Sequence, residues 1–236
     1  MLLKVLKVPD ILSTIKDGSI IKFKDRESAA QMLASVLKDH LKGIPSSEVT
    51  VLGIPRGGVI MAHIIYEKIN ANSFDIVIPR KLCAPHNREL GIGAIMKDGT
   101  IYRNEYVINA LKISSDYIED EISTQIKEID RRESLYRPEN RSYQISNKTI
   151  ILVDDGAATG ATLIAAIRWI RKQNPSKIIV AITVAPKETV ELLKQEADKV
   201  ESFIVPSTGN FNSVGQFYTD FAAVGDEEVV TIMKQA

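Results

Sequence analysis

Short apolar runs that lack hydrophobic–polar alternation recur along this chain and restrict its fold. A strand with one solvated face alternates, whereas a strand buried on both faces reads as a nearly continuous apolar run. Segments with helical periodicity separate the runs, and strands that alternate with helices favour a parallel sheet. We therefore expect an α/β fold with a doubly wound, mostly parallel, Rossmann-like sheet whose strands lie at 49–55, 74–82, 149–155, 177–186 and 201–206.

Two regions and the C-terminal segment depart from this alternation. A β-hairpin is predicted within 89–107, because Asp98-Gly99 separates two apolar runs there. The segment 115–142 predicts a long, charged helix that ends before Pro138. Glycine, asparagine and aromatic residues are frequent after Pro206, and we expect an irregular cap at about 206–225.

Composition narrows the class of protein. The 236 residues suit one large domain or a core domain with a smaller subdomain. Lys plus Arg and Asp plus Glu both total 30, so the balance favours neither a nucleic-acid binder nor a membrane-surface binder. Cys83 is the single cysteine, which excludes an internal disulfide framework. Lys4 and Lys7 interrupt the apolar start, so we expect no signal peptide and a cytoplasmic protein.

Three loops carry charge or glycine at points where predicted strands stop. Ligands of open parallel sheets bind beyond the carboxyl ends of the strands. The sequence therefore directs attention to residues 56–58, 80–81 and 154–162.

The third loop begins with two aspartates and continues with only small or hydroxyl-bearing residues. An acidic pair at a strand end can be a solvated turn, but a small-residue loop that opens a helix exposes backbone N–H groups to an anion such as phosphate. The carboxylates would repel that phosphate, so Asp154 and Asp155 suit the hydroxyls of a vicinal diol. A ribose 5-phosphate carries both groups. The P-loop and dinucleotide-binding patterns do not fit this loop.

The stretch ILVDDGAATGAT (151–162) resembles the ribose-phosphate signature of type I phosphoribosyltransferases, which bind 5-phosphoribosyl 1-diphosphate (PRPP). It departs at Ala161, where glycine is commoner. GIPRGGV (53–59) is similar to the family's diphosphate loop, and the resemblance makes Pro55-Arg56 a candidate cis peptide bond. PRKL (79–82) is similar to the diphosphate-binding Arg-Lys pair of orotate-type members.

The wider pattern, PRGGV, RKL, ELGIGA, VDDG, FY and DEEV in order, resembles a subgroup of uncharacterised predicted phosphoribosyltransferases. That resemblance covers about residues 22–236 and leaves 1–21 as an N-terminal extension. It also implies a flexible lid at about 83–107, a device that excludes water from a reactive intermediate. His86 in this lid would be either a general acid or a polar residue exposed in a loop.

The resemblance implies transfer of a phosphoribosyl group from PRPP to a nucleobase or small amine, with release of diphosphate. Mg²⁺ would be held through PRPP, and through Asp154 and Asp155 by way of water, rather than in an all-protein site. These two aspartates, Arg80 and Lys81 would carry catalysis. Diphosphate would bind at Arg56, Gly57, Gly58, Arg80 and Lys81. The 5-phosphate would bind at Gly156, Ala157, Ala158, Thr159, Gly160, Ala161 and Thr162.

Alternatives remain for the role of the protein and for its cap. A regulator that senses PRPP or a nucleotide without catalysis would have the same fold and ligand site. The aromatic residues of the cap would either stack on a flat acceptor or fill a small core; they are Phe211, Phe217, Tyr218 and Phe221. We expect a homo-oligomer, a dimer in the simplest case, with small-molecule partners and with neither a membrane nor a nucleic acid.

Overall fold

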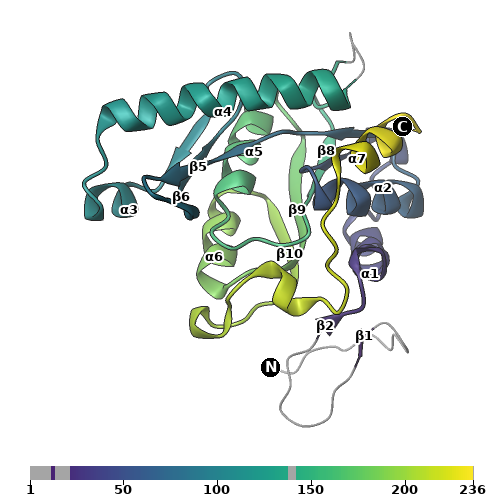
Figure 1. The fold of residues 1–236 in the computed structure, drawn as a ribbon. Coiled ribbons are helices and arrows are strands. Elements are labelled where there is room, and N and C mark those ends of the chain that lie inside the picture. Colours follow the sequence, from purple (N-terminus) through teal and green to yellow (C-terminus); the bar gives the residue numbers. More distant parts are fainter. Residues whose placement is uncertain (1–11, 14–21, 138–141, 236) are drawn as a thin grey trace.

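The structure is a computed structural model that describes residues 12–13, 22–137 and 142–235, with a parallel five-stranded sheet at its centre (Figure 1). The sheet order is β10–β9–β8–β3–β4, and all neighbouring strands are parallel. These strands are β3 (Val49–Gly53), β4 (Ser73–Ile76), β8 (Thr149–Val153), β9 (Lys177–Val184) and β10 (Lys199–Ile204). The predicted α/β class and parallel sheet are confirmed.

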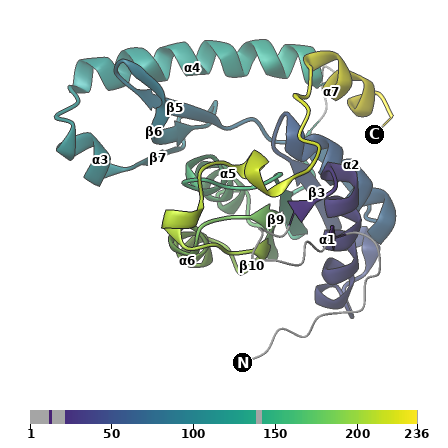
Figure 2. The same ribbon diagram turned by 60° about the horizontal axis from the view of Figure 1, so that its bottom comes forward.

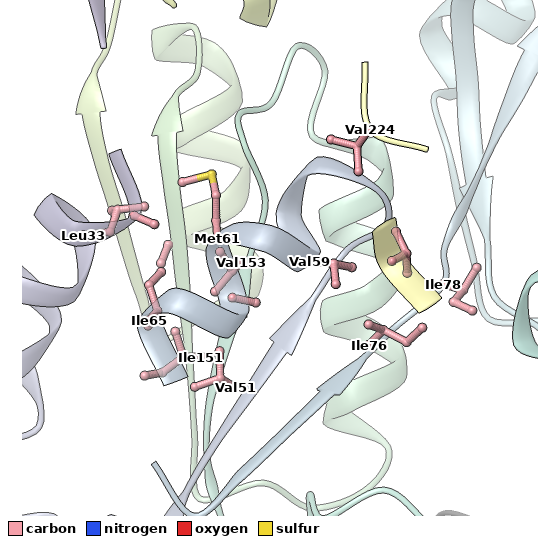
Figure 3. Close-up of a cluster of buried hydrophobic side chains, with 14 of the residues drawn as sticks. Leu33, Val51, Val59, Met61, Ile65, Ile76, Ile78, Ile151, Val153 and Val224 are labelled. Atoms are coloured by element: carbon pink, nitrogen blue, oxygen red, sulfur yellow. The ribbon is translucent and has the colours of Figure 1, made fainter. Parts of the chain in front are cut away.

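Helices cover both faces of this sheet, which explains the continuous apolar runs. Along β8, Ile151 and Val153 join the core beneath one pair of helices, whereas Ile150 and Leu152 join the core on the opposite face. The first face carries α1 (Arg26–His40) and α2 (Gly57–Ile69), and the second carries α5 (Ala161–Arg171) and α6 (Lys187–Glu196). Figure 3 shows side chains of α1 and α2 against Val51, Ile151 and Val153.

The predicted strand at 74–82 is wrong as a single element. The chain leaves the central sheet after β4, and the segment that begins at Arg80 enters a second sheet. Pro79 lies between the two strands, and proline has no backbone N–H for a strand ladder. Arg80 and Lys81 therefore begin an antiparallel strand instead of ending a parallel one.

This second, outer sheet is antiparallel and consists of β5 (Arg80–Ala84), β6 (Asn87–Ile95) and β7 (Ile101–Arg103). The predicted hairpin around Asp98-Gly99 is confirmed: Met96 N–H donates to the Thr100 carbonyl at 2.8 Å, and Gly99 has φ 84°. Two helices follow it, α3 (Glu105–Ala110) and α4 (Ser115–Tyr136), and α4 lies along the outer sheet (Figures 1 and 2).

The C-terminal cap returns to the beginning of the domain. It contains two short 3-10 turns, Thr208–Asn210 and Val214–Phe217, before α7 (Asp226–Met233) packs on α2 and α4. Thr219 N–H and Asp220 N–H donate to the carbonyls of residues 23 and 24, both at 2.8 Å. The cap therefore lies beside β2 (Lys22–Phe23) and the start of α1.

The N-terminal extension predicted at 1–21 lies almost wholly outside the described residues. Within it the structure describes β1 (Leu12–Ser13), which pairs antiparallel with β2. No helix in the described part of the chain has the length and apolar character needed to cross a membrane.

Candidate functional site

Two of the three predicted loops meet at the carboxyl edge of the central sheet. β3 and β8 are neighbours and end in register, with Gly53 opposite Val153. The first turn of α2, which follows β3, then contacts the loop after β8: a Cβ atom on Gly58 would lie 2.6 Å from the Val153 carbonyl oxygen and 2.9 Å from the Asp154 Cα. Glycine is therefore required at Gly58 for the two loops to approach so closely.

Gly57 allows a second close approach at the same place. A Cβ atom there would lie 2.0 Å from Asp155 Oδ2 and 2.7 Å from Arg26 Nε. The Pro55–Arg56 peptide bond just before it is cis, as the resemblance implied. The predicted loop at 56–58 is thus the N-cap and the first two residues of α2, and its glycines pack directly on the acidic pair.

Burial controls the charge of the two carboxyls. It raises the pKa of Asp154 well above its usual range, and the neighbouring Asp155 charge raises it further. Burial also raises the pKa of Asp155, although the Arg26 guanidinium opposes that shift. Asp155 N–H donates to Asp154 Oδ1 at 2.9 Å, which fixes the first carboxyl. The site therefore favours the approach of a cation or of hydrogen-bond donors.

Arg26 also belongs to this site, although no sequence pattern indicated it. It opens α1, where the capping box of Asp25 and Ser28 holds the helix start. Its Nε donates to Asp155 Oδ2 at 2.8 Å, and its side chain is 12% exposed. The partner lies 129 residues further along the chain, so no local pattern could have revealed the pair.

The loop at 156–162 leads into the N-terminus of α5, as predicted. Gly160 precedes that helix with φ 72°, and no side chain caps it. Ala157 N–H is engaged, however, since it donates to the Val184 carbonyl at 2.8 Å. The Ala157 N–H thus has an internal partner, whereas Ala158 and Thr159 are exposed. The phosphate contacts at 156–162 stay a prediction.

The Arg56 side chain contacts the C-terminal helix, α7. Its Nη1 lies 3.2 Å from Asp226 Oδ1, at the first residue of α7. Asp226 also accepts from the Tyr136 hydroxyl at 2.5 Å and from Arg131 at 3.4 Å. The guanidinium predicted to bind diphosphate thus has an internal carboxylate as its partner in this structure.

The third predicted loop lies on the outer sheet. Arg80 Nε donates to Gln125 Oε1 of α4 at 3.0 Å, and burial together with the Arg132 charge lowers the pKa of Arg80. Lys81 Nζ donates to the Glu89 carbonyl at 3.2 Å. The contacts of this pair are thus with α4 and β6, and its diphosphate role remains a prediction.

The cap aromatics divide between the two roles considered for them. Phe217 and Tyr218 are buried, which supports the small-core interpretation for these two. Tyr218 also serves the site, because its hydroxyl donates to the Asp155 carbonyl at 2.8 Å. Phe221 stacks beneath the Arg26 guanidinium at 3.8 Å. His86 lies exposed in the β5–β6 turn, with φ 60°.

Comparison with known proteins agrees with this geometry. The family model of the phosphoribosyl transferase domain matches residues 21–221. A Mycobacterium tuberculosis (strain H37Rv) protein named "Putative phosphoribosyl transferase Rv0571c" is 32% identical over 214 residues, which cover 91% of this chain and 47% of that protein. The chain therefore spans about half the length of that curated relative.

A solved structure agrees over nearly the full length of both chains. The crystal structure of TT1426 from Thermus thermophilus superposes with a TM-score of 0.72 at 33% identity, covering 91% of this chain and 98% of that one. The family match extends from the start of β2 to the end of the cap aromatics and includes both loops that meet at the sheet edge. This chain belongs to the phosphoribosyl transferase domain family.

Proposed function

We propose that the protein binds PRPP with Mg²⁺ and transfers its phosphoribosyl group to a nucleobase or a small amine. The observation that carries this proposal is the contact between the acidic pair after β8 and the two glycines that begin α2 after β3. One loop offers carboxylates for a diol, and the other offers backbone for a charged group close by. A ligand with a diol next to a diphosphate suits that arrangement.

The 5-phosphate end is assigned to the segment from Ala158 to Thr162. This segment opens α5, and backbone N–H groups at the start of a helix favour an anion. The Ala158 carbonyl accepts from Thr189 Oγ1 of α6, which fixes the loop from behind. Anchoring the phosphate orients the ribose, so binding energy from a non-reacting group assists the reaction.

Mg²⁺ suits the acidic pair on chemical grounds. Among the described residues, no group of three or more His, Cys, Asp or Glu side chains could hold a metal ion. Mg²⁺ commonly keeps several waters and binds substrate phosphates, so Asp154 and Asp155 would hold it by way of water beside PRPP. When bound, it would neutralise part of the diphosphate charge.

The proposed transfer of the phosphoribosyl group depends on positive charges placed near the departing diphosphate. The lone pair of the acceptor forms a bond to C1 of the ribose, and the C1–O bond breaks. Diphosphate leaves with the electron pair, and the acceptor proton passes to water or to the departing diphosphate. Cationic groups that meet the growing charge stabilise this step, and we assign that role to Arg56, Arg80 and Lys81.

The test is an assay of diphosphate release with protein, PRPP, Mg²⁺ and a panel of nucleobases and small amines. Release that depends on one acceptor, together with its ribosylated product by mass spectrometry, is the expected result. PRPP binding without turnover across the panel would favour a regulator that senses PRPP. Absence of PRPP binding would overturn the proposal.

A further inference from the structure

Helix α4 places two polar side chains against the outer sheet, where a packed helix normally presents apolar ones. Glu121 and Gln125 are 7% and 2% exposed, and they lie one turn apart on this helix. Gln125 Nε2 donates to Glu121 Oε1 at 3.0 Å, and Gln125 Oε1 accepts from Arg80 Nε at 3.0 Å. Burying an amide and a carboxyl costs free energy unless both are hydrogen-bonded, so their presence here requires a physical explanation.

An irregularity in the backbone of β5 explains Glu121. The pairing of β5 with β6 shifts register on both sides of Cys83, which interrupts the regular ladder there. Glu121 Oε1 accepts from the Cys83 N–H at 3.2 Å, and the Tyr117 hydroxyl donates to the Cys83 carbonyl at 3.0 Å. These two side chains thus supply hydrogen-bond partners to the backbone at the irregularity. Gln125 instead directs its amide oxygen to Arg80.

Arg80 begins β5 shortly after the chain leaves the edge of the central sheet that carries the acidic pair. Ile54 N–H donates to the Val153 carbonyl, and Val77 N–H donates to the Gly53 carbonyl, both at 3.0 Å. The ends of β8, β3 and β4 are therefore joined in this order along one edge. Because Val77 precedes Arg80 by only three residues, β5 starts close to the strand ends that form the candidate site.

The partner of the Arg80 guanidinium is a neutral amide, which distinguishes it from two other arginines contributed by the α4 region. Arg132 pairs with Glu128 at 2.7 Å, and Arg137 pairs with Asp75 at 2.8 Å. An amide oxygen on Nε orients a guanidinium without cancelling its charge, whereas a carboxylate would cancel it. The Nη groups of the same guanidinium are further donors, and their planar arrangement suits two oxygens of one phosphate.

We propose that Gln125 is a positioning residue for diphosphate, because its amide oxygen holds the Arg80 guanidinium in the orientation that binds this group while Glu121 holds the amide. This inference rests on the proposed function, which assigns Arg80 to diphosphate. Without the amide, the guanidinium would lose its fixed orientation and bind diphosphate more weakly. The effect should be confined to ligands that carry diphosphate, because the 5-phosphate is assigned to the separate segment 158–162.

The experiment measures the affinity for PRPP and for each of its two parts. Calorimetric Kd values are determined for PRPP and for diphosphate, each with Mg²⁺, and for ribose 5-phosphate, with the wild type, Arg80→Met and Gln125→Met. We expect Gln125→Met to bind PRPP and diphosphate about three- to tenfold more weakly. Its affinity for ribose 5-phosphate should be unchanged. A general loss of structure would weaken the binding of all three ligands.

A double variant tests whether Gln125 acts through Arg80. Once the guanidinium is gone, the amide has nothing left to orient. The protein with both Arg80→Met and Gln125→Met should therefore bind diphosphate with the same affinity as Arg80→Met alone. Two independent roles would instead give losses that add.

Ile129→Val is the matched control for the packing of α4. Ile129 is buried and lies one turn beyond Gln125 on the same helix. We expect this variant to lower Tm through lost packing and to leave all three Kd values unchanged. Thermal unfolding shows which variants are folded at the assay temperature. If Gln125→Met is not, Gln125→Asn decides in its place, because its shorter side chain keeps a buried amide but withdraws the oxygen from Arg80.

The possible outcomes separate this inference from the proposed function. Wild-type protein that fails to bind PRPP overturns both. If the wild type binds PRPP but Arg80→Met keeps full affinity for diphosphate, Arg80 does not bind this group, and the role of Gln125 is overturned with it. Three results overturn only the role of Gln125: full diphosphate affinity in its variants, an equal loss for ribose 5-phosphate, or additive losses in the double variant.

Discussion

At the scale of single residues, we expect Asp154 to bind the ligand and, at the same time, to destabilise the ligand-free fold. Burial and the Asp155 charge raise its pKa, so the folded, ligand-free protein is destabilised above that pKa and recovers as the pH falls through it. We predict that Asp154→Asn raises Tm at neutral pH by roughly 2–4 °C, the shift that about 1 kcal/mol produces in a chain of this size. The same variant should weaken PRPP binding by about tenfold or more.

Differential scanning fluorimetry and calorimetry check the two effects together. Asp39→Asn is the control, because Asp39 pairs with Lys42 on the surface of α1. It should change neither the PRPP affinity nor the Tm, because an exposed ion pair contributes little to stability. Unchanged affinity in Asp154→Asn would remove Asp154 from the diol assignment.

The prediction for Gly57 rests only on the steric clash that an added Cβ atom would cause. An added methyl group would stand 2.0 Å from Asp155 Oδ2, so the Asp155–Arg26 pair must move. We predict that Gly57→Ala lowers the free energy of unfolding by about 1–3 kcal/mol and weakens PRPP binding. Gly209→Ala is the control, since nothing lies within 4 Å of its added Cβ. Equal PRPP affinity in Gly57→Ala and wild type would show that the geometry of this pair does not matter for binding.

At the scale of elements, α4 carries a pH-sensitive ion pair on its surface. Hydrogen bonds from Arg131, and then from Arg132, lower the pKa of Glu128 to about 2. A depressed carboxyl stabilises the fold above its unfolded pKa, 4.5, and that contribution is lost as the pH falls toward about 2.

We predict that Glu128→Gln costs on the order of 1 kcal/mol at pH 7, after allowance for solvent screening. The difference from wild type should vanish in urea unfolding experiments near pH 2. Glu119→Gln, at an exposed position on the same helix, is the control. Its free energy of unfolding should equal that of the wild type at every pH. A Glu128→Gln deficit that persists at low pH would point to packing instead of charge.

The elements of the central sheet were predictable because their signal is local. The run at 149–153 is buried throughout, and continuous burial is what the absence of alternation reports. The prediction of one strand at 74–82 was wrong because apolar character alone does not show that two parts of a segment belong to different sheets. Only Pro79 marked the exit from the central sheet. Arg26 gave no signal, since its role depends on a contact with Asp155 made by the folded chain.

At the scale of the whole molecule, the two ends of the domain close around the site. The start of α1 supplies Arg26, and the cap supplies Phe221 and the Tyr218 hydroxyl. The N-terminus of α7 continues this closure, because Asp226 joins α4 to the loop after β3. Figure 2 shows α7 beside one end of α4. Parts of the chain that are remote in sequence thus determine the positions of charges beside the acidic pair.

The last prediction concerns Asp226, whose carboxylate would compete with diphosphate for the Arg56 guanidinium. If Arg56 binds diphosphate, it must first leave an internal carboxylate at 3.2 Å. Asp226→Asn removes that competing charge, so we predict PRPP affinity a few-fold higher, with a lower Tm from the weakened bond to Tyr136. Glu227→Gln, in the same first turn of α7, is the control for both measurements. A fall in PRPP affinity would instead mean that Asp226 orients Arg56 for its ligand, and calorimetric titration of the two variants distinguishes these outcomes.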